Sequence, residues 1–553
     1  MVLAHEIEDL RSQAIGSVGG QGSAPWRLPA PPRVSGRRAS PLAFRGVTEE
    51  RRVAGSAAIT AVFQIVAMAI GGVIAILVVG QFGKTPRSDG VFAAYGLYGL
   101  IYILAATLRS TVVARLAEDP SLFRALDRYI GGALVVFAVA ALPLVILGKP
   151  VAALLTGSLP HAAEDAAHSA LAIFWLAAGA HLVAALGAAT LAVRAEFALP
   201  GIAYVIGGAV SAGLLVALSG PLGTDAVPVG LAGGAALTAT IVFVRLAQIG
   251  YRPDPRLVWP SGLAGRAAVV MLIGAIPQLI SQIMYTVSLA FAAHLHAGSV
   301  TLFSYAFFAA LLVIGATSFP ATIVLAAPLA QDWDRRPESL EPHLVTVLRA
   351  GLILVAPVLA LAALSGDELI QLVLGGSLSA HDADTIVGTF LVFTGIIVIS
   401  IAVALPILAA FATGRYLRLA VLSASTAAFH VAANFAVLGA HRVQALAGVS
   451  SLDALLFLLL ILRMTFGAAA WRVALTLARE AAVVAGAAGV AFVPPALLSL
   501  VVGGGVAELA AWIVGTAAFV AVVRRLPGHW DLVRRMLQPV LGKRVVLEVT
   551  RAT

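Results

Sequence analysis

The sequence contains no cysteine, and only 11% of its 553 residues are charged. The absence of cysteine excludes a disulfide framework, a thiolate metal site and a cysteine nucleophile. The scarcity of charge excludes an ordinary water-soluble domain, in which about 25% of the residues are charged. Hydrophobic residues make up 60% of the chain, and the mean hydropathy is +0.98. Because soluble proteins need a polar surface, this composition predicts a membrane protein.

The apolar residues occur in long unbroken runs, which favour helices over the alternating strands of a membrane barrel. Each run has about 20 residues or more, enough to cross ~30 Å of hydrocarbon. We therefore predict an all-α polytopic membrane protein with about 14 transmembrane helices. The predicted spans are 54–82, 91–117, 129–148, 167–193, 197–218, 227–249, 266–293, 299–327, 345–364, 385–412, 416–438, 443–463, 479–501 and 506–523.

The basic residues predict how these spans are oriented. With a cytoplasmic N-terminus, 31 of the 36 basic residues fall on the cytoplasmic side, while Lys84, Arg87, Lys149 and Arg442 fall outside and Arg109 lies within a span. This bias follows the positive-inside rule and predicts a multi-pass protein with both termini cytoplasmic. The net charge of +9 is then a signature of topology, and no nucleic-acid partner is expected.

An internal repeat predicts the domain organisation. The segment Val91–Asp119 aligns with Val300–Asp332, so that Tyr95 falls on Tyr305, and the same offset separates the first and seventh spans. This repeat predicts two six-helix lobes around a central cavity. The predicted parts are a flexible cytoplasmic N-terminal tail (1–52), two six-helix lobes (53–250 and 251–465), two additional transmembrane helices (466–525) and a basic cytoplasmic tail (526–553).

Two turns carry a resemblance to a known family. The segment Gly83-x5-Asp89-x-Val-Phe-Ala-Ala-Tyr95 resembles the first periplasmic turn of the MurJ/MviN lipid II flippase family, and Gly298-Ser-Val-Thr-Leu-Phe-Ser-Tyr-Ala306 resembles its second hairpin. Asn434 also falls where relatives have asparagine. The resemblance covers residues 54–525 and implies the multidrug/oligosaccharidyl-lipid/polysaccharide (MOP) exporter fold. The family-matched turn positions are Gly83, Asp89, Gly298 and Tyr305.

The resemblance implies a flippase in the bacterial inner membrane. Its substrate would be a polyprenyl-linked saccharide, either a peptidoglycan lipid precursor or a related cell-envelope glycan, moved by alternating access. The implied partners are this lipid-linked glycan, membrane lipids and a coupling cation or proton. The chain departs from the family because no Lys or Arg lies between Arg52 and Lys84, and the segment Tyr305-Ala-Phe-Phe308 carries no charge. The departure leaves the identity of the glycan open.

Enzyme motifs do not explain the sequence. Gly83-Lys84-Thr85 resembles the end of a phosphate-binding loop, but Val78 stands where that loop requires glycine. The chain has no HExxH and no GxSxG motif. The paired carboxylates Asp382 and Asp384 lie in a predicted loop, where solvent is their expected partner. We therefore expect neither catalysis nor a cofactor.

Polar residues within the spans are candidate functional groups because they are costly in lipid. Asp453, in the twelfth span, is a candidate coupling site for a proton or cation. The alternative is a protonated carboxyl that is hydrogen-bonded to a neighbouring helix. Arg109 is a candidate contact for an anionic substrate, and the alternative is a side chain that extends to the cytoplasmic surface.

Two polar stripes follow helical spacing. One contains Gln278, Gln282 and Tyr285, and the other contains Ser423, Thr426, His430 and Asn434. Residues three or four apart share a helix face, so each stripe predicts either an aqueous groove or hydrogen bonds between helices. The predicted cavity residues are Gln64, Arg109, Gln278, Gln282, Tyr285, His430 and Asn434.

Two rival functions follow from the same features. One is an ion-coupled exporter of small molecules on the same fold, which would depend on Asp453. The other is a non-transporting membrane scaffold that docks cell-wall enzymes through its basic tails. Deleting the tails would abolish the scaffold function, whereas substitutions in the cavity would leave it unchanged.

Overall fold

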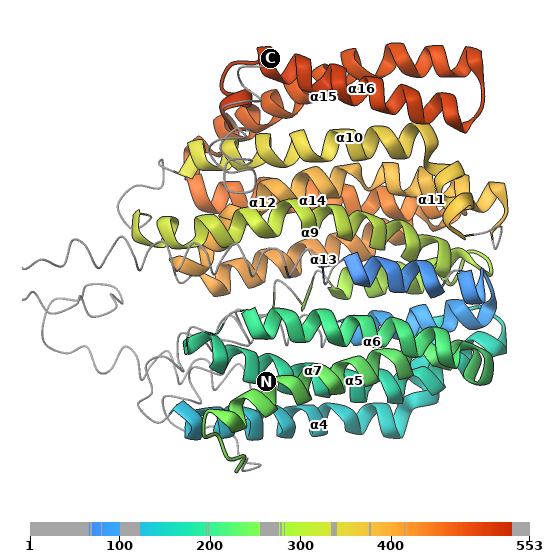
Figure 1. Ribbon diagram of the computed structural model, residues 1–553, viewed down its shortest axis with the longest axis vertical. Helices are drawn as coiled ribbons and strands as arrows, with labels where there is room; N and C mark the ends of the chain where they lie inside the picture. Colours follow the sequence, from blue (N-terminus) through green and yellow to red (C-terminus); the bar gives the residue numbers. More distant parts are fainter. Residues whose placement is uncertain are drawn as a thin grey trace, which may run out of the picture. The chain divides into compact units, whose positions relative to one another are not determined.

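The computed structural model places helices joined by short turns along most of the chain (Figure 1). The chain divides into two units, Met1–Val53 and Ala54–Thr553, and every described residue belongs to the second unit. The described residues are 63, 66, 69–78, 80–99, 122–194, 196, 198–254, 276, 279–280, 282–332, 340–374, 378–413 and 415–532.

Four long helices form the first bundle, here called the N-terminal bundle. In it α4 packs on α5, α5 packs on α7, and α6 packs on α7. Gly207 and Gly234 allow the closest approach, because a Cβ added to Gly234 would lie 2.3 Å from the carbonyl oxygen of Gly207. Such small residues let backbones approach closely in membrane proteins. The elements are α4 (Leu122–Thr156), α5 (His161–Val193), α6 (Ala198–Leu222), η1 (Gly223–Asp225) and α7 (Ala226–Gln248).

A second bundle, here called the C-terminal bundle, is built around α14, which packs on α11, α12 and α13. Two further helices, α15 and α16, pack on each other and on α10. The backbone leaves helical geometry at Ser365 within α10, where φ is −137°. The elements are α9 (Ser299–Asp332), α10 (Leu340–Leu374), α11 (Ala380–Val392), α12 (Thr394–Ala412), α13 (Tyr416–Val437), η3 (Leu438–Ala440), α14 (Val443–Phe466), η4 (Gly467–Ala469), α15 (Ala470–Val502) and α16 (Gly505–Arg525).

Three shorter helical segments lie where the two bundles meet. Residues 86–99 follow the helix Ala69–Phe82 and pack against α5, where a Cβ on Gly90 would lie 2.0 Å from the carbonyl oxygen of Ala163. The helix Gln282–Ala292 leads into α9 through a turn. Residues 80–99 are counted with the N-terminal bundle because they pack on α5, and the helix Gln282–Ala292 is counted with the C-terminal bundle because it leads into α9. These segments carry the contacts between the bundles that are described below.

The predicted fold class is confirmed by these helices. Seven stretches within the described part of the chain are long and apolar enough to cross a membrane. Helix ends also agree closely with the predicted spans, as at α7 (predicted 227–249) and α13 (predicted 416–438). The protein is thus a multi-pass helical membrane protein.

Candidate functional site

The two bundles meet through a buried carboxylate at one end of the helices. Asp89 accepts hydrogen bonds from the backbone N–H of Gly298 and from the backbone N–H and hydroxyl of Thr301. Thr301 lies in the first turn of α9 and Gly298 immediately precedes that helix, so Asp89 caps its N-terminus from the other bundle. Burial raises the pKa of the Asp89 carboxyl, while the hydrogen bonds from Thr301 and Gly298 and the charge of Lys84 oppose the rise.

An ion pair lies beside this carboxylate. The Lys84 ammonium donates to Asp382 Oδ1 at 2.6 Å, which links the turn at 83–85 to the start of α11. The prediction that solvent is the partner of Asp382 is therefore wrong, although Asp384 is exposed. The reason is local: Ser379 caps α11 by accepting from the N–H of Asp382, and its hydroxyl donates to the Asp382 carboxylate.

Two glycines permit this close approach. Gly83 and Gly298 both have positive φ, of +59° and +93°, a region that favours glycine. A Cβ on Gly298 would lie 2.3 Å from Cδ of Lys84, so the lysine side chain passes directly over the glycine. We call this set of contacts, carried by Lys84, Asp89, Gly298, Thr301 and Asp382, the clasp. The two turns matched to the family separately thus contact each other.

Further contacts between the bundles lie at or near the same end. The Ser158 hydroxyl donates to the carbonyl oxygen of Ala293 at 3.2 Å. Deeper in the membrane domain, Gln282 donates through Nε2 to the carbonyl oxygen of Gly96 at 3.2 Å. Gln282 was predicted as a cavity residue, and in this conformation it bridges the two bundles.

Aromatic rings fill the region beneath the clasp. Tyr305 packs edge-on against Phe92 of the other bundle, with ring centroids 5.3 Å apart. Tyr285 stacks on Phe307 at 4.2 Å, and its hydroxyl donates to Ser304 at 3.2 Å. Edge-to-face and offset-stacked pairs are the geometries that aromatic rings prefer. In this conformation Tyr285 and Tyr305 are buried packing residues.

A buried hydrogen-bonded chain crosses the C-terminal bundle. Asp453 on α14 is hydrogen-bonded through Oδ2 to Nδ1 of His430 on α13. The other ring nitrogen of His430 lies 2.9 Å from the Ser288 hydroxyl on the helix Gln282–Ala292. Ser288, His430 and Asp453 are 0%, 1% and 3% exposed. Sequence analysis selected Asp453 and His430 on separate grounds, and the structure brings them together.

The order Ser288–His430–Asp453 resembles the hydrogen-bond order of hydrolytic triads. A serine nucleophile must reach a substrate carbonyl, and Ser288 is 0% exposed in the interior of a helix bundle. In this conformation the arrangement can hold and move a proton, but a substrate carbonyl cannot reach the hydroxyl.

The other residues of the α13 stripe are buried beside this chain. Ser423 and Thr426 donate to backbone carbonyls within α13 itself. Asn434 donates through Nδ2 to the carbonyl oxygen of His430 at 2.9 Å, and its Oδ1 has no hydrogen-bond partner among the described residues. Buried amide oxygens are normally paired. The unpaired Oδ1 of Asn434 can therefore accept a hydrogen bond from a further donor.

At the opposite end of the helices, the described ion pairs hold each bundle internally. In the N-terminal bundle, Arg245 donates two hydrogen bonds to Glu196, both at 2.8 Å, and this pairing lowers the pKa of Glu196. In the C-terminal bundle, Arg349 donates two hydrogen bonds to Glu480, both at 2.6 Å. The clasp, in contrast, joins the two bundles.

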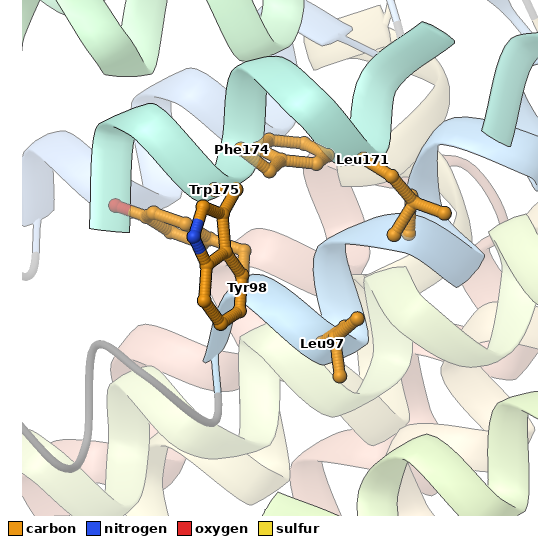
Figure 2. Close-up of a pocket in the computed structure, with 6 residues that line it drawn as sticks. Leu97, Tyr98, Leu171, Phe174 and Trp175 are labelled. Atoms are coloured by element: carbon orange, nitrogen blue, oxygen red, sulfur yellow. The ribbon is translucent and has the colours of Figure 1, made fainter. Parts of the chain in front are cut away.

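A small pocket lies within the N-terminal bundle, between residues 86–99 and α5 (Figure 2). Phe174 and Tyr98 form one side, with ring centroids 5.3 Å apart. The Trp175 indole lies beside them in Figure 2, and its buried Nε1 has no partner among the described residues. Nδ1 of His181 lies 3.3 Å from the Tyr98 hydroxyl.

Three predicted cavity residues, Gln64, Arg109 and Gln278, lie outside the described residues. The residues that sequence analysis missed are Ser288 and Thr301. Ser288 continues the stripe of Gln282 and Tyr285 at helical spacing, so extending that stripe by one turn would have found it. Thr301 lies within the family-matched segment Gly298–Ala306, but no local pattern shows its role, which depends on a carboxylate more than 200 residues away.

Comparison with known proteins supports the architecture. No protein-family model and no curated protein matches the sequence. Among solved structures, the fold is similar to lipid II flippase MurJ in its inward closed conformation, with a TM-score of 0.67 and 14% identity over 83% of this chain and 97% of that one. It is also similar to an inward-facing multidrug resistance MATE family transporter of the MOP superfamily (TM-score 0.56, 16% identity, 75% of this chain and 98% of that one).

A third similar structure is a MOP superfamily transporter from Pyrococcus furiosus (TM-score 0.52, 15% identity, 76% of this chain and 96% of that one). At such low identity these comparisons show the fold alone. The fold implied by the two turn motifs is confirmed by them. The chain therefore has the fold shared by MurJ and the MATE transporters, in a multi-pass helical membrane protein.

Proposed function

We propose that the protein is an alternating-access flippase that moves a polyprenyl-linked saccharide across the bacterial inner membrane. The observation that carries the proposal is the clasp. It closes the two bundles at one end through Asp89, while ion pairs such as Glu196–Arg245 hold each bundle internally at the other end. Two rigid bundles joined at one end are what alternating access requires.

The predicted topology places the clasp at the outer face of the membrane. In the proposed cycle, a saccharide head enters between the bundles from the cytoplasmic side while the lipid tail stays in the bilayer. Opening of the clasp then releases the head to the outside. Asp453 is the proposed site at which a coupling ion drives the cycle.

The choice of a lipid-linked substrate is supported by the extent of the structural likeness. The match to the lipid II flippase covers 83% of this chain, and the match to the inward-facing MATE transporter covers 75%. A second candidate is favoured by those same MATE structures: an ion-coupled exporter of small molecules on this fold.

The test is depletion of the protein in its native host, with lipid-linked saccharides quantified by mass spectrometry and their exposure probed from outside the cell. We expect one inward-facing polyprenyl-linked saccharide to accumulate. Unchanged lipid-linked saccharides, together with altered resistance to small cationic compounds, would support the exporter instead. Re-expression of the wild-type protein should reverse the accumulation.

A further inference from the structure

The buried chain across the C-terminal bundle identifies the coupling ion. We propose that His430 and Asp453 together hold one proton while the clasp is closed, and that loss of this proton releases the helix Gln282–Ala292 through Ser288. The inference rests on the proposed transport function and names the ion and the moving element. It starts from the contacts Asp453–His430 and His430–Ser288, which join three helices in the interior.

The number of protons follows from the charge of the pair. Without a bound proton, a neutral His430 beside an ionised Asp453 has a net charge of −1. With one proton the pair is neutral overall, and with two its charge is +1. Both residues are at most 3% exposed, and a buried net charge is strongly unfavourable. The closed conformation therefore favours the state with one proton.

Among the described residues, His430 and Asp453 form an ion pair with each other alone. The helix Gln282–Ala292 and α12 contain no charged residue. The acid Asp382 is engaged by Lys84, and Glu480 is engaged by Arg349. The charged and titratable residues with described side chains on the elements around the pair are Tyr285, Tyr305, His381, Asp382, Asp384, Arg418, Arg463, Arg472, Arg479 and Glu480.

A proton suits this site better than a metal cation. Hard cations bind several oxygen ligands, whereas one carboxylate oxygen of Asp453 is already bonded to an imidazole nitrogen. The described part of the chain also contains no group of three or more His, Asp or Glu residues that could hold a metal ion. An imidazole paired with a carboxylate offers two groups that can each accept and release a proton.

Ser288 transmits the protonation state to the interface. While the pair holds its proton, Nε2 of His430 carries a hydrogen and donates to the Ser288 hydroxyl. When the proton is lost, the remaining ring hydrogen lies on Nδ1 facing the Asp453 carboxylate, so the hydroxyl has to donate to Nε2 instead. Ser288 lies on the helix whose Gln282 donates to Gly96 of the other bundle. The same helix leads directly to Gly298, which donates to Asp89 in the clasp.

Burial of the pair determines how the equilibrium between the closed and open conformations depends on pH. The closed conformation binds the proton more tightly than an open, hydrated one, so closure is favoured at low pH and is lost as the pH rises. For a single linked proton, the ratio of open to closed molecules changes by at most about tenfold per pH unit.

The experiment uses the full-length protein, whose lack of cysteine allows specific labelling. Ala162→Cys and Ala380→Cys place spin labels at exposed positions on the two bundles beside the clasp. The distance between the labels is measured in lipid nanodiscs, without substrate, from about pH 5.5 to about pH 8.5. We expect the fraction of long distances to rise with pH, and Asp453→Asn or His430→Gln to abolish this response.

Two control variants isolate the pair. Thr426→Val changes an equally buried polar residue of α13 whose hydrogen bond stays within the helix, so the pH response should remain. Asp89→Asn removes the buried carboxylate of the clasp, which should raise the open fraction and retain its increase with pH.

The proposal is overturned if Asp453→Asn and His430→Gln retain the pH response of the parent protein. It is also overturned if Na⁺ at constant pH shifts the distances in the parent and not in Asp453→Asn, because the ion would then be a metal cation. If Asp453→Asn fails to assemble, His430→Gln decides alone. The measurement needs no substrate, so a wrong choice of glycan leaves its outcome unchanged.

Discussion

Asp89 shows how much a single residue contributes to closing the molecule. Its carboxylate accepts hydrogen bonds from Thr301 in the first turn of α9 and from Gly298 just before that helix. In Asp89→Asn, one acceptor oxygen becomes an NH₂ group that faces N–H donors, which we expect to destabilise the closed clasp by about 1–3 kcal/mol. A cysteine at Val300, which is 0% exposed, should then react with a maleimide at least about fivefold faster than with Asp89 intact.

A matched control for this substitution lies in the N-terminal bundle. Asp127 is also a buried carboxylate, and it accepts from the Tyr251 hydroxyl at 2.6 Å and from the Asp254 N–H at 3.1 Å. Asp127→Asn makes the same change to a buried carboxylate whose hydrogen-bond partners lie within one bundle, so the labelling of Val300→Cys should not change. If Asp89→Asn and Asp127→Asn accelerate the maleimide labelling of Val300→Cys equally, the clasp does not depend on Asp89 specifically.

The residue scale also shows what the sequence could predict of the site. Asp453 was identifiable because an ionisable residue within an apolar run requires a partner. The partner, His430, is 23 residues away on another helix, and only the packing of α13 on α14 shows that the two meet. Asp382 was assigned to solvent because its cation, Lys84, is 298 residues away. Long-range pairing of this kind leaves no local pattern.

At the scale of elements, the crossing of α6 and α7 makes a prediction about stability. A Cβ on Gly234 would lie 1.9 Å from the Ser211 hydroxyl, while a Cβ on Gly213 of α6 would meet nothing within 4 Å. We expect Gly234→Ala to lower the stability of the protein by about 1–3 kcal/mol, because the helices have to separate. Gly213→Ala should be neutral or stabilising by up to about 1 kcal/mol, because alanine favours the helix.

The thermal unfolding midpoint in detergent checks both glycine variants. A lower midpoint for Gly234→Ala and an unchanged or higher midpoint for Gly213→Ala would support the close crossing of α6 and α7. Equal midpoints would contradict it, because both variants add the same methyl group to a transmembrane helix.

Helices were more predictable than their contacts. Among the described helices, apolar length alone placed α6, α7, α13, α14 and α16 within a few residues, since the hydrocarbon thickness sets a minimum run of about 20 residues. The errors lie where helices extend beyond the apolar core: α4 was predicted as 129–148 and covers Leu122–Thr156. Its first turns include Arg124, Asp127 and Arg128, which hydropathy excludes from a span although they continue the helix.

At the scale of the whole molecule, the clasp and the paired charges at the opposite end have complementary roles. Lys84 and Asp382 belong to different bundles, whereas Glu196 and Arg245 belong to the same one. A link across the bundles prevents them from moving apart, and a link within a bundle leaves that motion unaffected. Alternating access therefore requires the first pair to separate during transport and has no such requirement for the second.

This difference gives a direct test of the cycle. In Lys84→Cys/Asp382→Cys, a reducible thiol crosslinker should stop translocation of a polyprenyl diphosphate-linked saccharide across the bilayer of liposomes, and reduction should restore it. The same crosslinker in Glu196→Cys/Arg245→Cys should leave translocation unchanged, because both positions move with one bundle. Lipid exposed on the outer surface is measured by its modification with an added enzyme. If the crosslinked clasp variant transports at the same rate as before crosslinking, the two bundles do not have to separate at the clasp, and the proposed cycle is wrong.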